Sequence, residues 1–98
     1  MPKDSPISRE FGENLAVQAL AYLAQDPERL GVFLGLTGIG PDRIRKAAAD
    51  PAFLAGVLDH VASDERLLRA VADFAGVPPE TVQRAHLALS GRWEREVP

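Results

Sequence analysis

The sequence predicts an all-helical protein, a compact bundle of about six short helices. Apolar residues recur every third or fourth position along most of the chain. Residue pairs that are typical of helix starts occur at helix-length intervals. No run alternates between apolar and polar residues for long enough to form a strand. The expected helices cover about residues 8–25, 27–36, 41–49, 51–62, 64–75 and 79–90.

The first two helices differ in how their apolar residues are distributed. Asp26-Pro27 is expected to start the second helix. The aspartate side chain can cap the first turn. Proline fits the first helical position, because the backbone N–H that it lacks would have no partner inside the helix there. The second helix is apolar on nearly every side. The apolar stripe of the first helix consists of Phe11, Leu15, Ala19, Tyr22 and Leu23.

The other four helices follow the same logic. Gly40-Pro41-Asp42 and Asp50-Pro51 start the third and fourth, and Ser63-Asp64 starts the fifth. In the last three helices, apolar residues fall on one face at helical spacing. These residues are Phe53, Leu54, Val57, Leu58 and Val61 in the fourth, Leu67, Leu68, Val71 and Phe74 in the fifth, and Val82, Ala85 and Leu89 in the sixth.

Size and composition favour one globular domain over residues 1–98, with flexible ends at about 1–7 and 92–98. Leu, Ile, Val and Phe make up 27 of the 98 residues, above the roughly one-fifth below which chains stay disordered. The absence of cysteine excludes disulfides and is simplest to reconcile with the cytoplasm. The longest nearly apolar run, residues 31–40, is about half of what a membrane span needs, so no membrane contact is expected.

One segment resembles a helix-turn-helix. Ala72, Gly76 and Val82 stand where that motif needs a small residue, a turn residue and an apolar lock. The segment 71–85 is similar to the DNA-binding headpiece of lac-repressor-type regulators. That resemblance implies DNA contacts from the second helix, namely from Thr81, Gln83 and Arg84. The alternative is a packed helical corner, which the acidic Glu80 and the net charge of −3 favour.

A second segment resembles the hairpin of helix-hairpin-helix modules. The segment Gly38-Ile39-Gly40-Pro41 matches the hairpin, and Arg43, Arg45 and Lys46 follow it. In such modules, the hairpin amides and the next helix hold a phosphate, so these three residues are further candidate DNA contacts. The alternative role is a connector between two helices, which Asp42 favours because it stands where the anion would bind.

Catalytic chemistry is not expected. The two histidines, His60 and His86, lie on different predicted helices, and Asp59 points about 100° away from His60 around the helix. No serine or threonine lies in a nucleophile-elbow pattern. We therefore expect no catalytic residue, metal site, cofactor or small-molecule ligand.

Most of the chain, about residues 13–90, resembles a family of short bacterial proteins known only as domain of unknown function 3572. The resemblance implies a common helical domain and no known activity, ligand or partner. The residues that carry it are Glu13-Asn14-Leu15-Ala16, Phe33-Leu34-x-Leu36-Thr37-Gly38-Ile39, Pro51-x-Phe53-Leu54-x-Gly56-Val57-Leu58 and Asp64-Glu65-x-Leu67-Leu68.

The function predicted from the sequence is a small, non-enzymatic helical module that binds another protein. An apolar groove beside the second helix is the candidate contact, because that helix is apolar on nearly every side. The alternative is that this helix is central and simply buried. DNA binding by a regulator or accessory factor is the other hypothesis. The candidate protein-contact residues are Leu30, Phe33, Leu34, Leu36 and Trp93.

Overall fold

A computed structural model describes residues 7–91 of the chain, and this part is all-helical, as predicted. No strand occurs between these residues. Its elements are α1 (Arg9–Ala24), α2 (Pro27–Thr37), the 3-10 turn η1 (Pro41–Arg43), α3 (Ile44–Ala47), α4 (Pro51–Ala62), α5 (Glu65–Ala75) and α6 (Pro79–Gly91).

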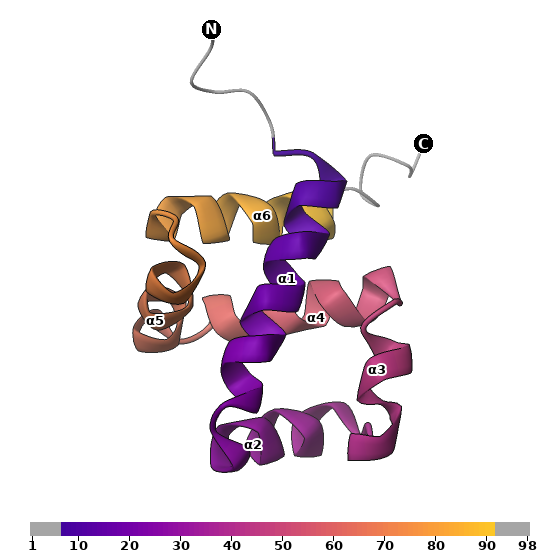
Figure 1. The fold of residues 1–98 in the computed structure, drawn as a ribbon. Coiled ribbons are helices and arrows are strands. Elements are labelled where there is room, and N and C mark those ends of the chain that lie inside the picture. Colours follow the sequence, from indigo (N-terminus) through magenta and orange to yellow (C-terminus); the bar gives the residue numbers. More distant parts are fainter. Residues whose placement is uncertain (1–6, 92–98) are drawn as a thin grey trace, which may run out of the picture.

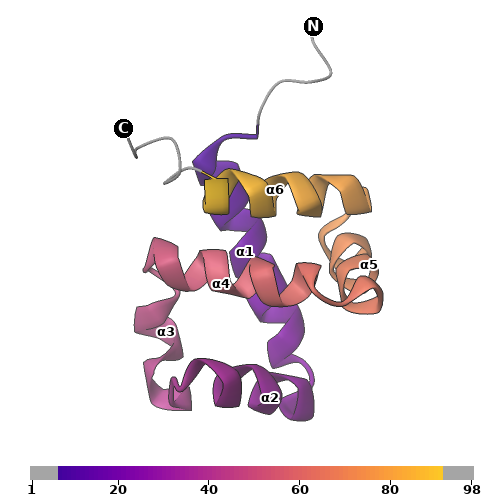
Figure 2. The same cartoon turned by 180° about the vertical axis from the view of Figure 1, so that it is seen from behind.

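Helix α1 is the central element, and α2, α4, α5 and α6 all pack against it. Helices α4 and α6 cross it on the same side, α5 joins them at one edge, and α2 lies across its far end (Figure 1). From behind, α4 and α6 lie in front of α1 (Figure 2). One core therefore serves the whole molecule. It contains Leu15, Ala16, Ala19, Leu20, Leu23, Phe33, Leu34, Phe53, Leu54, Val57, Leu58, Val61, Leu67, Leu68, Val71, Ala72, Val82, Ala85 and Leu89.

Small residues let α6 approach α1 closely. Gly12 faces Leu89, and a β-carbon at Gly12 would lie only 3.2 Å from that leucine's side chain. Ala16 and Ala19 are completely buried on the same side of α1. The buried face of α1 is thus centred on its small residues rather than on its aromatic ones.

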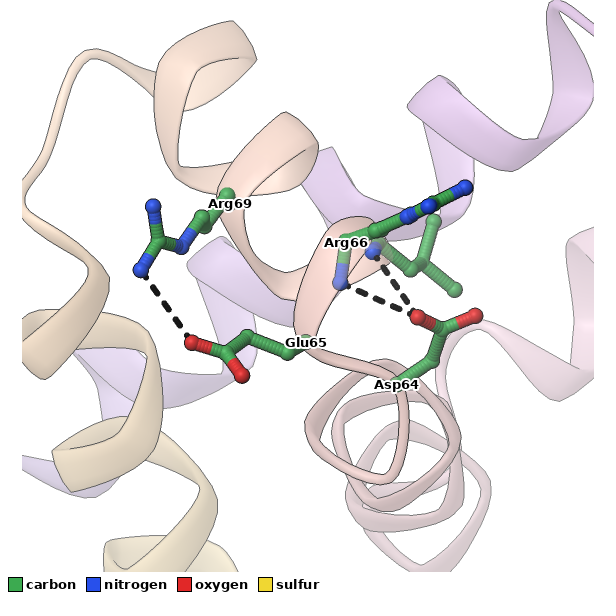
Figure 3. A network of polar contacts seen from close by, with 5 residues as sticks. Asp64, Glu65, Arg66 and Arg69 are labelled. Carbon is green, nitrogen blue, oxygen red and sulfur yellow. Dashed lines mark hydrogen bonds and ion pairs between the residues drawn. The ribbon is translucent and has the colours of Figure 1, made fainter.

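Capping side chains start four of the helices where the sequence predicts. The Ser8 hydroxyl accepts a hydrogen bond from the Phe11 amide at 3.0 Å. The carboxylates of Asp26 and Asp50 accept bonds from the first-turn amides of α2 and α4. At α5, the Asp64 carboxylate accepts hydrogen bonds from the backbone amides of Arg66 and Leu67, at 3.0 and 3.4 Å (Figure 3). These bonds satisfy amides that have no partner inside the helix.

Two glycines end helices in the left-handed conformation. Gly38 closes α2 with φ 76°, and Gly76 closes α5 with φ 73°. A side chain would be strained at either position, because a β-carbon disfavours positive φ. These two residues therefore set where the chain turns from α2 toward α3 and from α5 toward α6.

The third predicted helix, residues 41–49, is present but is shorter and less regular than predicted. The chain forms a 3-10 turn at Pro41–Arg43 and then a single α-helical turn at Ile44–Ala47. Ile44 is the only large apolar side chain in this stretch, and it is half-buried. A helix of this length gains most of its stability from packing one apolar face, and this segment has too little to pack.

Two aromatic residues predicted to lie on buried faces are largely exposed. Phe11 and Phe74 each keep 42% of their surface accessible, and Tyr22 is half-buried. For Phe11 and Tyr22, the reason is that α1 turns Gly12, Ala16 and Ala19, not its aromatic edge, toward the core. The Tyr22 and Phe74 rings instead meet each other at the edge of the bundle, with centroids 5.5 Å apart.

Several expectations fall on the chain ends. The predicted flexible ends lie outside the described residues, apart from Ile7, and so does Trp93. Within residues 7–91, no helix has both the length and the apolar character needed to cross a membrane.

Candidate functional site

Helix α2 carries two of the three most exposed large apolar side chains among residues 7–91. Val32 and Leu36 lie one turn apart on this helix, and 59% and 72% of their surfaces are exposed. Residues four apart on a helix are neighbours on its surface, so these two side chains form one continuous patch. We call Val32 and Leu36, with the glycines Gly31 and Gly35 that directly precede them, the outer face of α2.

The opposite face of α2 belongs to the core. Phe33 is 2% exposed and packs against the ring of Phe53 on α4, with centroids 5.7 Å apart, and against the His60 ring at 5.1 Å. Leu34 is buried and Leu30 is half-buried. Of the predicted contact residues on α2, therefore, only Leu36 is well exposed, and the other three attach the helix to the molecule.

Packing among residues 7–91 does not explain the two glycines of the outer face. A β-carbon at Gly31 or Gly35 would meet no atom within 4 Å. Glycine inside a helix costs about 0.5–1 kcal/mol relative to alanine. Two such residues lower the stability of α2 without a compensating contact, and they leave the helix backbone open to close approach from outside.

The other exposed apolar side chains are scattered. Leu87 is 64% exposed on α6, where Glu80, Gln83 and Arg84 surround it at helical spacing. Phe11 and Val17 lie on α1 six residues apart, on different sides of the helix. Single exposed apolar residues are normal on protein surfaces, whereas a continuous patch indicates a contact.

A shallow groove of about 490 Å³ runs between α4 and the end of α6. On the α4 side, its wall consists of small residues one turn apart, with a single carboxylate at one end. Because these side chains are short, the groove is a hollow that a larger apolar side chain could fill. Its lining residues are Pro51, Ala52, Ala55, Gly56, Asp59, Leu89 and Ser90.

The two histidines have contacts that stabilise the fold. His86 Nε2 lies 3.2 Å from Asp59 Oδ1, which links α6 to α4 at the end of the groove. His60 packs its ring against Phe33. The His86–Asp59 contact could not be predicted from the sequence, because the two residues are 27 positions apart and no local pattern connects them.

The three residues assigned from the sequence to a helix-turn-helix, Ala72, Gly76 and Val82, lie at the corner between α5 and α6. Ala72 and Val82 are completely buried, and Gly76 makes the left-handed turn between the helices. The Val77 amide also donates to the Ala72 carbonyl at 2.9 Å. Of the candidate DNA contacts, Gln83 is exposed on the outward side of α6 and Thr81 is half-buried.

The basic candidates do not converge with this corner. Arg43, Arg45 and Lys46 are exposed on η1 and α3. Both views place α3 at the opposite edge of the molecule from α5 and from the start of α6 (Figures 1 and 2). The α5–α6 corner and α3 therefore lie at opposite edges, and the candidate DNA contacts are divided between α6 on the one hand and η1 and α3 on the other.

The hairpin before α3 also differs from a phosphate-binding hairpin. Gly40 precedes a 3-10 turn rather than an α-helix, and the Asp42 carboxylate lies beside it, 2.9 Å from the place of a β-carbon. An acid in this position repels an anion. Among residues 7–91, no three histidine, aspartate or glutamate side chains are grouped to hold a metal ion.

A family model described as "Protein of unknown function (DUF3572)" matches residues 9–92, which is most of the chain. No curated protein and no solved structure matches the sequence. The match agrees with the resemblance seen in the sequence. It does not test the resemblance of residues 71–85 to lac-repressor-type regulators.

Proposed function

We propose that this chain, which belongs to the DUF3572 family of proteins of unknown function, is a non-catalytic helical module that binds another protein molecule through the outer face of α2. The observation that carries the proposal is the exposure of Val32 and Leu36 on a helix whose other face is in the core. The proposed location is the cytoplasm, which the lack of cysteine favours.

The arrangement of α2 suits a rigid contact surface. Phe33 and Leu34 fix the helix to the bundle, so Val32 and Leu36 are held in place before any partner arrives. A partner that packs against a preformed helix loses less conformational entropy than one that must order it. Protein interfaces place apolar side chains at their centre and polar ones at the rim. Glu28 and Arg29 lie at the rim of this face.

A non-catalytic role is supported by what the ionisable side chains do. Both histidines have contacts within the fold, with Phe33 and Asp59 respectively. Asp26, Asp50 and Asp64 cap helices. The two histidines and these aspartates would be the first candidates for acid–base chemistry, and each of them has a contact within the fold.

Photo-cross-linking in the native host tests the proposal. We would replace Leu36 with a photoreactive phenylalanine analogue, and Leu87 with the same residue as a matched control on α6. We expect a discrete cross-linked product from position 36, its loss when Val32 is also changed to Glu, and no such product from position 87. Equal products from both positions, or none from position 36, would contradict the proposal.

DNA binding is the second candidate, because Ala72, Gly76 and Val82 build the corner that a helix-turn-helix requires. In that case, Gln83 and Arg84 would contact a DNA duplex. A titration of labelled duplex against salt separates the two functions, since phosphate contacts weaken steadily as salt rises. Salt-sensitive binding that Arg84→Ala removes would favour DNA. Our proposal predicts no binding even at low salt.

A further inference from the structure

We propose that the partner of the outer face of α2 is a second copy of this chain, which receives α2 in its groove between α4 and α6. This inference rests on the proposed function and specifies the partner. The two surfaces, both present on every copy, match in shape, in charge and in the spacing of their residues.

The first surface projects outward. Val32 and Leu36 are the protruding side chains, and the open space beside Gly31 and Gly35 lets another helix approach the backbone of α2. Arg29 lies one turn before Val32, on the same side of the helix. Read along α2, this surface is a cation followed by two large apolar side chains, each about one turn apart.

The second surface is hollow. Along α4, read from its end toward its start, the groove presents the carboxylate of Asp59, then Gly56 with Ala55, then Ala52. A β-carbon at Gly56 would meet no atom of the described residues within 4 Å, so residues 7–91 leave this place empty. This surface is an anion followed by two positions with small side chains, again about one turn apart.

The residues along α2 match those along the groove when α2 of one copy lies antiparallel to α4 of the next copy. Arg29 then faces Asp59, and Val32 and Leu36 project over the small residues of the groove. Large side chains in small-residue hollows are how helices interdigitate. The antiparallel arrangement also sets the helix dipoles in opposition, which is favourable.

Neither charge is locked into a strong pair within its own copy. Arg29 Nε lies 3.7 Å from Asp26, and both side chains are about half exposed. The Asp59 side chain is 77% exposed and contacts His86 through one oxygen, so the other carboxylate oxygen can accept a bond from Arg29. Because different faces of the two copies meet, the contact is heterologous and passes from copy to copy, closing into a ring if the rotation permits.

Sedimentation velocity on the purified 98-residue chain at rising concentration tests this inference. The informative variants are Leu36→Glu, which puts a charge on the projecting surface, and Gly56→Arg, which fills the hollow. Both positions are exposed and have room in a single copy, so both variants should fold; their unfolding midpoints check this. Leu87→Glu is the matched control.

We expect the parent chain and Leu87→Glu to associate as concentration rises, and each of the two informative variants to lose roughly tenfold or more in affinity. An equimolar mixture of Leu36→Glu and Gly56→Arg should recover association as a one-to-one complex, because each variant keeps the surface that the other has lost.

Three results would overturn the inference: a parent chain that stays monomeric, association that neither variant weakens, or a mixture that stays monomeric while the parent associates. The outcome is separable from that of the proposed function. If Leu36 cross-links in the host to a different protein and the purified chain stays monomeric, the function of the outer face of α2 stands and the second copy is excluded as its partner.

Discussion

At the scale of single residues, five of the glycines fall into three groups by their surroundings and their backbone conformation. Gly12 lies against Leu89 at the crossing of α1 and α6, whereas Gly31 and Gly35 have open space around them. Gly38 and Gly76 hold left-handed turns. Replacing a glycine by a residue with a side chain is therefore expected to stabilise the fold at some of these positions and to destabilise it at others.

The helical glycines give the first prediction. Gly31→Ala and Gly35→Ala should each raise the free energy of unfolding by about 0.5–1 kcal/mol, because alanine costs less backbone entropy in a helix. Gly12→Leu should lower it by about 1–3 kcal/mol, because the added side chain has no room beside Leu89. Urea unfolding of the three variants measures both effects. Stabilisation at Gly12 would show that the α1–α6 crossing is looser than the structure indicates.

The capping aspartates give the second prediction. Asp50→Ala or Asp64→Ala should each destabilise the fold by about 0.5–2 kcal/mol, because the first-turn amides of α4 or α5 lose an acceptor. Asp42→Ala is the matched control, since no side-chain hydrogen bond caps the 3-10 turn there. Thermal unfolding of the three variants tests this, and an equal loss at Asp42 would refute the capping argument.

At the scale of helices, most of the helix positions could be predicted from short-range patterns in the sequence. Asp26, Asp50 and Asp64 mark the starts of α2, α4 and α5, because capping is a short-range interaction that the sequence displays directly. Helical spacing likewise identifies the buried face of α4. Segment 41–49 could not be predicted in the same way. Whether a short segment forms a full helix depends on how much it can bury, which is a property of the assembled molecule.

The candidate site was predictable only in part. Because α2 is apolar on nearly every side, the sequence indicated a contact beside this helix, and of its four candidate residues Leu36 is well exposed. The side of α2 that faces the core is set by contacts such as those of Phe33 with Phe53 and His60, which are at least 20 positions away in the sequence. Periodicity alone therefore could not distinguish the buried Phe33 from the exposed Val32. The groove between α4 and α6 has no signature in sequence, because distant segments form it.

The α5–α6 corner gives a third prediction. Gly76→Ala should destabilise the protein by about 1–2 kcal/mol, because the left-handed conformation is strained for any residue with a β-carbon. Gly56→Ala, in the middle of α4, serves as the control and should be neutral or stabilising. Chemical unfolding of both variants measures the difference. Equal effects would mean that the corner does not depend on its left-handed residue.

At the scale of the whole molecule, one core occupies the inward faces of α1, α2, α4, α5 and α6. The outer face of α2 is the patch that this core does not use. The protein is therefore expected to keep its fold when this face is made polar. The same change is expected to remove its contacts with other molecules.

The free energy of unfolding of a Val32→Glu, Leu36→Glu double variant, measured in urea beside that of Phe33→Ala, tests this account most directly. The double variant should unfold within about 0.5 kcal/mol of the parent, as surface changes do. Phe33→Ala should lose about 3–5 kcal/mol, because Phe33 is buried against Phe53 and His60. If the double variant loses as much as Phe33→Ala, the outer face of α2 is part of the core and is not a surface kept for a partner.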